Sequence, residues 1–124
     1  MIQISSLPFR QLVIAELSGF LSVQDVADLE RQKVAAARAM GLGSGEFDLL
    51  VDTTRCDIQP QDVIAAFQSM IANTPCRARN VALVRATSLA RMQAQRALNR
   101  ENVALVDSRT EALDWLSRAS MAAA

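Results

Sequence analysis

The apolar and polar residues of the chain follow two patterns, one typical of buried strands and one typical of amphipathic helices. Residues 47–52 contain three consecutive aliphatic residues at positions 49–51, which favours a strand covered on both faces. The stretch that follows Pro60 is predicted to be a helix that ends near Asn73, because a proline follows two residues later. Its apolar residues recur at the helical period and are Val63, Ile64, Phe67, Met70 and Ile71. We therefore expect the fold to be organised around this strand and helix.

Shorter patterns complete an element order of ββαβαβαβα. Residues 2–5 and 12–17 are predicted to form a hairpin, because a short connection that contains a proline separates them. Residues 80–84 and 102–106 repeat the buried-strand pattern, and helices are predicted over residues 88–99 and from Ser108 onward. This order predicts an α/β fold with a single mixed, mostly parallel sheet flanked by helices.

The first helix is predicted to begin after Ser22, which caps it, with Asp25 three residues later as a weaker version of the capping box. Glu30 and Lys33 fall within its apolar arc. We interpret them as a rim pair that snorkels past the edge of the sheet, with a functional carboxylate as the alternative. The predicted buried face of this helix comprises Val23, Val26, Ala27, Val34, Ala37 and Met40.

The glycine-rich segment 41–45 follows this helix instead of preceding one. It is therefore interpreted as a helix cap and turn and not as a phosphate-binding loop.

Composition restricts the class of protein. The 124 residues suffice for one domain, residues 1–124, with its own core. The 13 basic and 13 acidic residues balance. The amino terminus does not resemble a signal peptide and no run approaches the roughly 20 apolar residues of a membrane span, so we expect a cytoplasmic protein. Cys56 and Cys76, without any histidine, do not make an ordinary zinc site and are expected to be free thiols.

The residues near the end of the central strand offer little chemistry. Without histidine, the chain lacks the commonest general base and the usual partner of a nucleophile, so we expect neither an enzyme nor a cofactor. Asp52, Asp57 and Asp62 lie where ligands of parallel sheets bind. We interpret them as caps and turn residues, with a Mg²⁺ site as the alternative. Cys56 is interpreted as inert, since a reactive thiol would need the helix amino terminus to lower its pKa.

Six arginines and no acidic residue lie between Asp62 and Glu101. If they shared one face, they would form a basic surface for phosphates, an acidic protein or an anionic membrane. The lack of interleaved aromatic residues argues against a nucleic-acid partner. The predicted basic surface comprises Arg77, Arg79, Arg85, Arg91 and Arg96, and the sixth arginine is Arg100.

The element order and two stretches of sequence resemble a known family. Residues 49–58 read Leu-Leu-Val-Asp-Thr-Thr-Arg-Cys-Asp-Ile and lead into a helix, and residues 106–116 read Val-Asp-Ser-Arg-Thr-Glu-Ala-Leu-Asp-Trp-Leu. Over nearly the whole chain, these features resemble the SpoIIAA-like group of STAS domains. The resemblance implies binding to a partner protein, with a homodimer as a further expectation. Because this group is likened to CRAL-TRIO (SEC14-like) domains, the alternative is a carrier of a hydrophobic molecule or a domain that associates with anionic membrane surfaces.

One departure from the family pattern changes the predicted regulation. Switching members carry a phosphorylatable serine in an Asp-Ser-Ser-Gly-like turn before the helix, whereas residues 57–61 here read Asp-Ile-Gln-Pro-Gln. No serine or threonine occurs between Thr54 and Ser69. The resemblance therefore implies a non-enzymatic regulatory or protein-interaction module without that phosphorylation switch. Its predicted docking surface comprises Thr54, Arg55, Asp57, Gln59 and Gln61.

Overall fold

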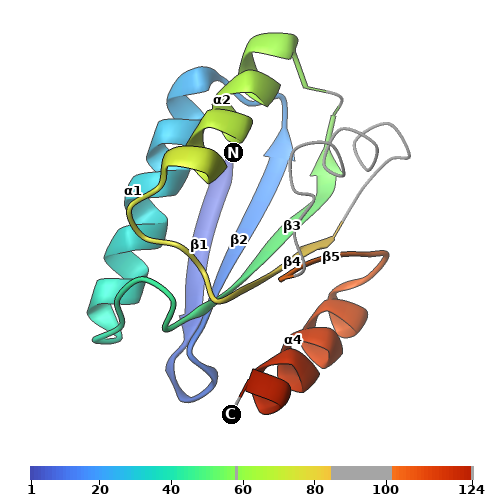
Figure 1. Ribbon diagram of the computed structural model, residues 1–124. Coiled ribbons are helices and arrows are strands. Elements are labelled where there is room, and N and C mark those ends of the chain that lie inside the picture. Colours follow the sequence, from blue (N-terminus) through green and yellow to red (C-terminus); the bar gives the residue numbers. More distant parts are fainter. Residues whose placement is uncertain (58, 85–101, 124) are drawn as a thin grey trace.

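The computed structural model describes residues 1–57, 59–84 and 102–123. The five strands form one sheet in the order β1-β2-β3-β4-β5, so β3 is central as predicted (Figure 1). The helix predicted over residues 88–99 lies outside the described residues. The strands are β1 (Ile2–Leu7), β2 (Leu12–Gly19), β3 (Asp48–Cys56), β4 (Asn80–Val84) and β5 (Val103–Val106). The described helices are the short 3₁₀ helix η1 (Pro8–Arg10), α1 (Val23–Ala39), α2 (Gln61–Asn73) and α4 (Arg109–Ala123).

The sheet is mixed and mostly parallel, which confirms the predicted fold class. Strand β1 pairs with β2 in the antiparallel sense, and the other three pairs are parallel. The parallel pairs β2/β3 and β3/β4 are joined through α1 and α2 respectively, as crossover connections require. The register places Ile14, Leu50 and Ala82 side by side across β2, β3 and β4. These aliphatic residues therefore form a continuous apolar row, which packs against α4.

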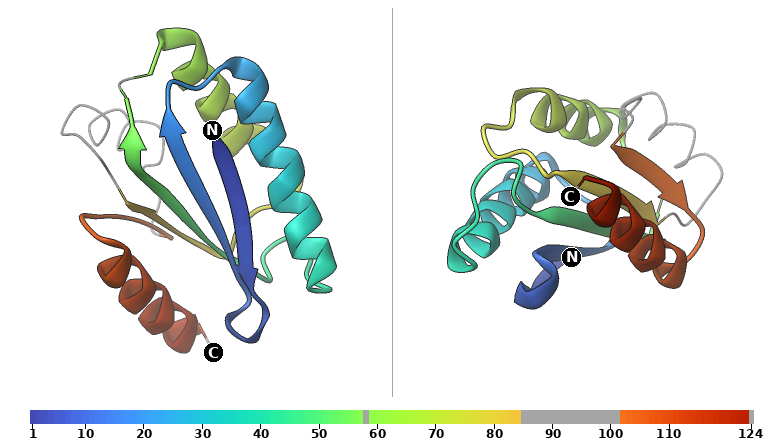
Figure 2. Two further views of the ribbon diagram at one scale, coloured as in Figure 1. Left: turned by 180° about the vertical axis from the view of Figure 1, so that it is seen from behind. Right: turned by 60° about the horizontal axis from the view of Figure 1, so that its bottom comes forward.

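Helices cover both faces of the sheet (Figure 2). On one face, Ala112 and Leu116 of α4 pack on apolar residues of β2, β3 and β4. On the other face, α1 and α2 contribute Leu29 and Val63, and Phe47 before β3 is fully buried. A strand that is covered on both sides has no solvent-exposed face, which explains why β3 contains consecutive aliphatic residues.

Both ends of α1 agree with the sequence prediction. The Ser22 hydroxyl accepts a hydrogen bond from the Asp25 amide at 3.1 Å, and the Asp25 carboxylate accepts one from the Ser22 amide at 2.8 Å. At the other end Gly41 has a φ of 74°, and the Leu42 amide donates to the Ala37 carbonyl at 2.9 Å. This geometry is that of a Schellman cap. The glycine-rich segment is therefore a helix cap, as interpreted.

The buried face of α1 differs from the predicted one, because Val23 is 48% exposed and Ala27 is also exposed. Lys33 is only 4% exposed, so the interpretation of a snorkelling rim pair was wrong. The Lys33 Nζ lies 2.7 Å from Glu30 Oε2 and 3.2 Å from Thr74 Oγ1. A lysine ammonium can occupy a core position when it is paired with a carboxylate and hydrogen-bonded, because these contacts offset the cost of removing its charge from water. The observed buried face comprises Val26, Leu29, Lys33 and Ala37.

Candidate functional site

The carboxyl ends of β2 and β3 and the starts of α1 and α2 meet at one edge of the sheet, at the top of Figure 1. The register places Gly19 beside Cys56 at the ends of the two strands, so the loops that follow lie side by side. Most of the predicted docking residues are exposed here, together with two apolar residues. We define the carboxyl-edge surface as Phe20, Val23, Thr54, Arg55, Asp57 and Gln61, all of which are exposed.

Gln59, the fifth predicted docking residue, instead holds the two loops together. Its Oε1 accepts a hydrogen bond from the Leu21 amide at 2.8 Å, and its Nε2 donates to the Gly19 carbonyl at 2.9 Å. The same Nε2 donates to the Asp57 carbonyl at 2.7 Å. The Asp57 amide also donates to the Gly19 carbonyl, at 3.1 Å. The side-chain amide of Gln59 is therefore a structural link beneath the surface.

The sequence interpretation missed the two apolar members of this surface. Phe20 is 70% exposed and Val23 is 48% exposed, whereas Leu21 between them is only 5% exposed. Periodicity does not say which of several apolar residues in a short connection faces the core, because the loop path decides it. A single exposed apolar residue is ordinary, whereas a group of them with a polar border is typical of an interaction site.

The three carboxylates near the carboxyl end of the central strand do not assemble a metal site. Asp52 Oδ2 lies 3.1 Å from Arg109 Nη2, and Asp52 Oδ1 accepts a hydrogen bond from the Thr54 amide at 3.0 Å. Asp62 Oδ1 accepts a hydrogen bond from the Val63 amide at 2.9 Å. Within residues 1–57, 59–84 and 102–123, no group of three or more His, Cys, Asp or Glu residues could hold a metal ion. Asp57 is exposed in the loop after β3, as a turn residue would be. Asp52 instead lies within β3, and Asp62 lies in the first turn of α2, whose amino terminus has no side-chain cap hydrogen bond, so the predicted turn and cap roles were wrong for these two residues.

Arg109 fastens the start of α4 to the carboxyl ends of β2 and β3. Its Nη2 lies 2.9 Å from Glu16 Oε1 and 3.1 Å from Asp52 Oδ2. Burial raises the pKa of the Asp52 carboxyl, but hydrogen bonds from Thr54 and Arg109 outweigh burial, so that pKa lies below its usual value. Asp52 is therefore ionised and paired at neutral pH, which suits a structural role and not proton transfer.

Cys56 is half-buried at the end of β3. Burial raises the pKa of its thiol to about 11. At neutral pH the group is thus protonated and a poor nucleophile. This agrees with the predicted inert thiol, and neither Cys56 nor Cys76 forms a disulfide.

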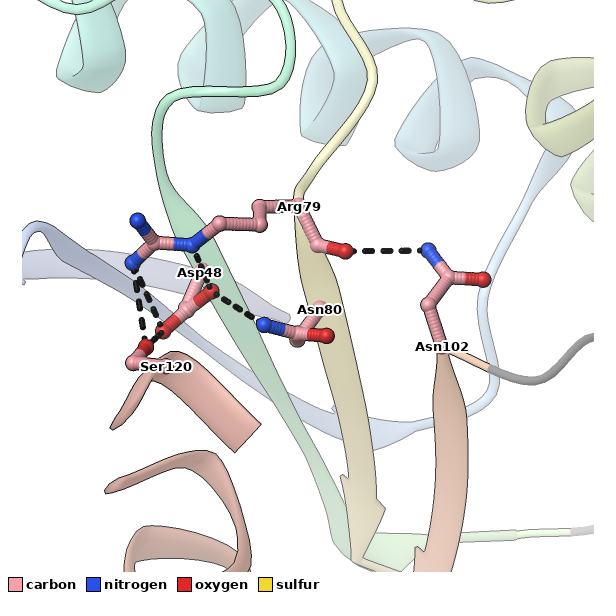
Figure 3. Close-up of polar contacts among 5 residues, drawn as sticks. All are labelled: Asp48, Arg79, Asn80, Asn102 and Ser120. Carbon is pink, nitrogen blue, oxygen red and sulfur yellow. Dashed lines mark hydrogen bonds and ion pairs between the residues drawn. The ribbon is translucent and has the colours of Figure 1, made fainter. Parts of the chain in front are cut away.

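The opposite edge of the sheet carries a buried polar cluster, which we define as the amino-edge cluster of Asp48, Arg79, Asn80 and Ser120 (Figure 3). Asp48 is 3% exposed and accepts hydrogen bonds from Arg79 Nε and Nη2 at 3.1 and 3.2 Å. It also accepts from Asn80 Nδ2 at 3.2 Å and from Ser120 Oγ at 2.6 Å. Four donors saturate a carboxylate. The cluster therefore ties the last turns of α4 to the starts of β3 and β4.

The amino-edge cluster removes one arginine from the predicted basic surface. The Arg79 guanidinium binds Asp48 and Ser120, so it does not offer a free cation. Arg77 is exposed and has an interaction of its own. The other predicted members, Arg85, Arg91 and Arg96, lie outside the described residues, as does Arg100. Among the helices that the structure describes, none has the length and apolar character needed to cross a membrane.

A scan against protein-family models and a search of curated proteins each found no match to this chain. Solved structures do match. An uncharacterized protein of the DUF3478 family with a SpoIIAA-like fold, from Shewanella loihica PV-4, aligns with a TM-score of 0.69 and 19% identity, over 94% of this chain and 92% of that chain. The anti-sigma factor antagonist SpoIIAA in its unphosphorylated form aligns with a TM-score of 0.64 and 13% identity, over 94% of this chain and 98% of that chain. The chain therefore has a SpoIIAA-like fold of the STAS type, as its sequence resemblance predicted.

Proposed function

We propose that this protein is a non-enzymatic interaction module that binds a partner protein through the carboxyl-edge surface. The observation that carries the proposal is the pair of exposed apolar residues, Phe20 and Val23, beside polar residues on two linked loops. An apolar centre with a polar rim is the usual composition of a protein interface. The similarity in fold to a protein named as an anti-sigma factor antagonist, whose target is itself a protein, supports a protein partner.

The chemistry of this surface supports a role without catalysis. The Cys56 thiol has its pKa raised to about 11 by burial, and the Asp52 carboxylate is paired with Arg109. No histidine occurs in the sequence to act as a general base. Of the groups that could perform chemistry here, the thiol is thus protonated and the Asp52 carboxylate is already paired.

The proposal includes binding that is not switched by phosphorylation at the start of α2. Thr53 Oγ1 donates a hydrogen bond to the Val84 carbonyl at 2.6 Å, so this hydroxyl faces the sheet. The Thr54 hydroxyl donates to the Asp52 carboxylate. A phosphate on Thr54 would meet a like charge, instead of the free amides and positive dipole end of a helix.

Labelled ATP in a lysate of the source organism tests this part of the proposal. We expect no stoichiometric label on Thr53 or Thr54. Stoichiometric label on either residue, together with altered partner binding, would contradict an unswitched module.

A matched pair of charge variants tests the docking surface itself. The partner is isolated by crosslinking and mass spectrometry, purified, and titrated with each variant. Arg55→Glu with Gln61→Arg alters the surface and is expected to weaken binding by about tenfold or more. Arg38→Glu with Gln32→Arg makes the same changes at exposed positions of α1 and is expected to leave the affinity unchanged. Equal effects of both pairs, or no partner at all, would contradict the proposed function.

A further inference from the structure

One side chain holds the backbone on both sides of Phe20. Gln59 accepts a hydrogen bond from the Leu21 amide at 2.8 Å and donates one to the Gly19 carbonyl at 2.9 Å. Gly19 has a φ of 68°, a conformation that glycine adopts without strain. Leu21 is 5% exposed and anchored in the core. The chain therefore enters and leaves Phe20 along a fixed path, while the Phe20 side chain is 70% exposed.

A fixed, exposed phenylalanine is suited to bind an apolar pocket. Its apolar surface faces water in the free protein, so its transfer to a pocket is favourable. An aromatic side chain with two rotatable bonds on a fixed backbone loses little conformational entropy on binding. Anchor residues at the centre of protein interfaces have these properties. Val23, which is 48% exposed, adds apolar area from the first turn of α1.

The charges around Phe20 indicate what borders such a pocket. Asp57 and Asp62 are exposed on the side of α2, and Asp25 lies in the first turn of α1. Among residues 1–57, 59–84 and 102–123, the cations at this edge are Arg55 at the end of β3, the Met1 ammonium on the side of β1, which donates to the Ser18 carbonyl at 2.8 Å, and Arg109, which is paired with Glu16 and Asp52. On the side of α2, the described carboxylates therefore outnumber the described cations. A lysine or arginine on the partner would complement them there.

We propose that Phe20 inserts into an apolar pocket of the partner protein, that Gln59 holds Phe20 in its binding conformation, and that a basic residue at the rim of the pocket contacts Asp57. This inference rests on the proposed function and deepens it. It distinguishes a contact residue, Phe20, from a positioning residue, Gln59, which acts through Phe20. The partner is a folded protein whose pocket is apolar and bordered by lysine or arginine.

Photo-crosslinking from a photoreactive residue, placed at either of two phenylalanine positions, identifies the partner. The amino acid p-benzoylphenylalanine replaces Phe20 or, as the matched control, Phe9 in the full chain, in cells of the source organism. Phe9 is 86% exposed on η1, at the opposite end of β2 (Figure 1). We expect position 20 to capture one protein through residues that line an apolar pocket with a basic rim. Capture of a second copy of this chain or of a lipid at position 20, or of the same protein from position 9, would overturn the inference.

Titration of the purified partner then separates the roles. Phe20→Ala is expected to weaken binding by about 30-fold, as for an interface hot spot. Gln59→Ala is expected to weaken binding by about tenfold in the wild-type background and to have no further effect beside Phe20→Ala, because a positioning residue acts through the residue it holds. Asp57→Asn is expected to reduce the salt dependence of the association rate. In Gln59→Ala, hydrogen exchange of the Leu21 amide should be faster than in the wild type, because the hydrogen bond to this amide is lost. The urea midpoint of Phe20→Ala should stay at the wild-type value, because the exposed side chain does not contribute to the core.

The outcomes separate the inference from the proposed function. A partner that binds Phe20→Ala as tightly as the wild type would overturn the anchor and leave the interaction module standing. Additive effects of Gln59→Ala and Phe20→Ala would overturn the positioning role of Gln59. Failure of the wild-type protein to bind any protein would overturn the proposed function and, with it, the inference.

Discussion

The two edges of the sheet gather the same kinds of residue and arrange them differently. At the amino edge, Asp48 is 3% exposed and receives four hydrogen bonds from Arg79, Asn80 and Ser120. At the carboxyl edge, Asp57 and Arg55 are exposed beside Phe20, which is 70% exposed. Removing one partner from a saturated, buried cluster destabilises the fold, and such a cluster has no capacity for another partner. An exposed polar rim beside an apolar side chain contributes little to stability and remains available for binding.

The largest expected effect is on the amino-edge cluster. Asp48→Ala leaves the Arg79 guanidinium without its counter-charge, and is expected to lower the free energy of unfolding by about 3–5 kcal/mol. Urea unfolding measures this change. Asp57→Ala is the matched control at the carboxyl edge and is expected to change stability by less than about 0.5 kcal/mol. Similar losses from the two variants would remove the distinction between the edges.

The reactivity of Cys56 tests whether the carboxyl edge is chemically inert. Because burial raises the thiol pKa from 9.0 to about 11, alkylation by iodoacetamide at pH 8 is expected to be roughly 100-fold slower than in the urea-unfolded chain. Mass spectrometry of the Cys56 peptide follows the rate separately from that of Cys76. A rate in the folded protein equal to or above that of the unfolded chain would point to an activated thiol.

A smaller effect is expected where α4 joins the amino-edge cluster. Ser120→Ala removes the 2.6 Å hydrogen bond to Asp48, and a hydrogen bond to a charged group contributes about 1.5–3 kcal/mol. Ser117→Ala, at an exposed position of the same helix, is the control and is expected to be neutral within about 0.5 kcal/mol. If Ser120→Ala were as neutral as the control, the last turns of α4 would not be held by this contact.

The pairing of Asp52 with Arg109 is expected to give a modest dependence of stability on pH. The folded-state pKa of Asp52 lies below its unfolded value of 3.8, so its contribution is fully present above that value and is lost as pH falls through the folded pKa. Asp52→Asn should therefore be less stable than the wild type at neutral pH, and the gap should narrow below about pH 4. Urea unfolding across this range measures the gap. A gap that stays constant with pH would show that the carboxylate charge is not responsible.

Local patterns in the sequence were sufficient to predict the scaffold. The capping box of Ser22 and Asp25 and the aliphatic run of β3 depend on residues close together in the chain, so spacing alone indicates them.

The features that distinguish the two edges depend on contacts between distant residues. Asp48 and Arg79 are 31 residues apart, and Gln59 binds Leu21 across 38 residues. Periodicity carries no information about such pairs. The helical arc therefore placed Lys33 at the rim, and the run of arginines without an acidic residue placed Arg79 on a basic surface, although both cations are bound to carboxylates.

Stability and partner affinity, measured together on Phe20→Ala and Ser120→Ala, test the central claim most directly. We predict that each variant changes one of these two quantities and leaves the other at its wild-type value. Phe20→Ala should retain the wild-type urea midpoint and lose about 30-fold in affinity for the partner protein. Ser120→Ala should lose about 1.5–3 kcal/mol of stability and bind the partner like the wild type when folded. Unchanged affinity in Phe20→Ala, or weakened binding in folded Ser120→Ala, would contradict the assignment of recognition to the carboxyl edge and of stability to the amino edge.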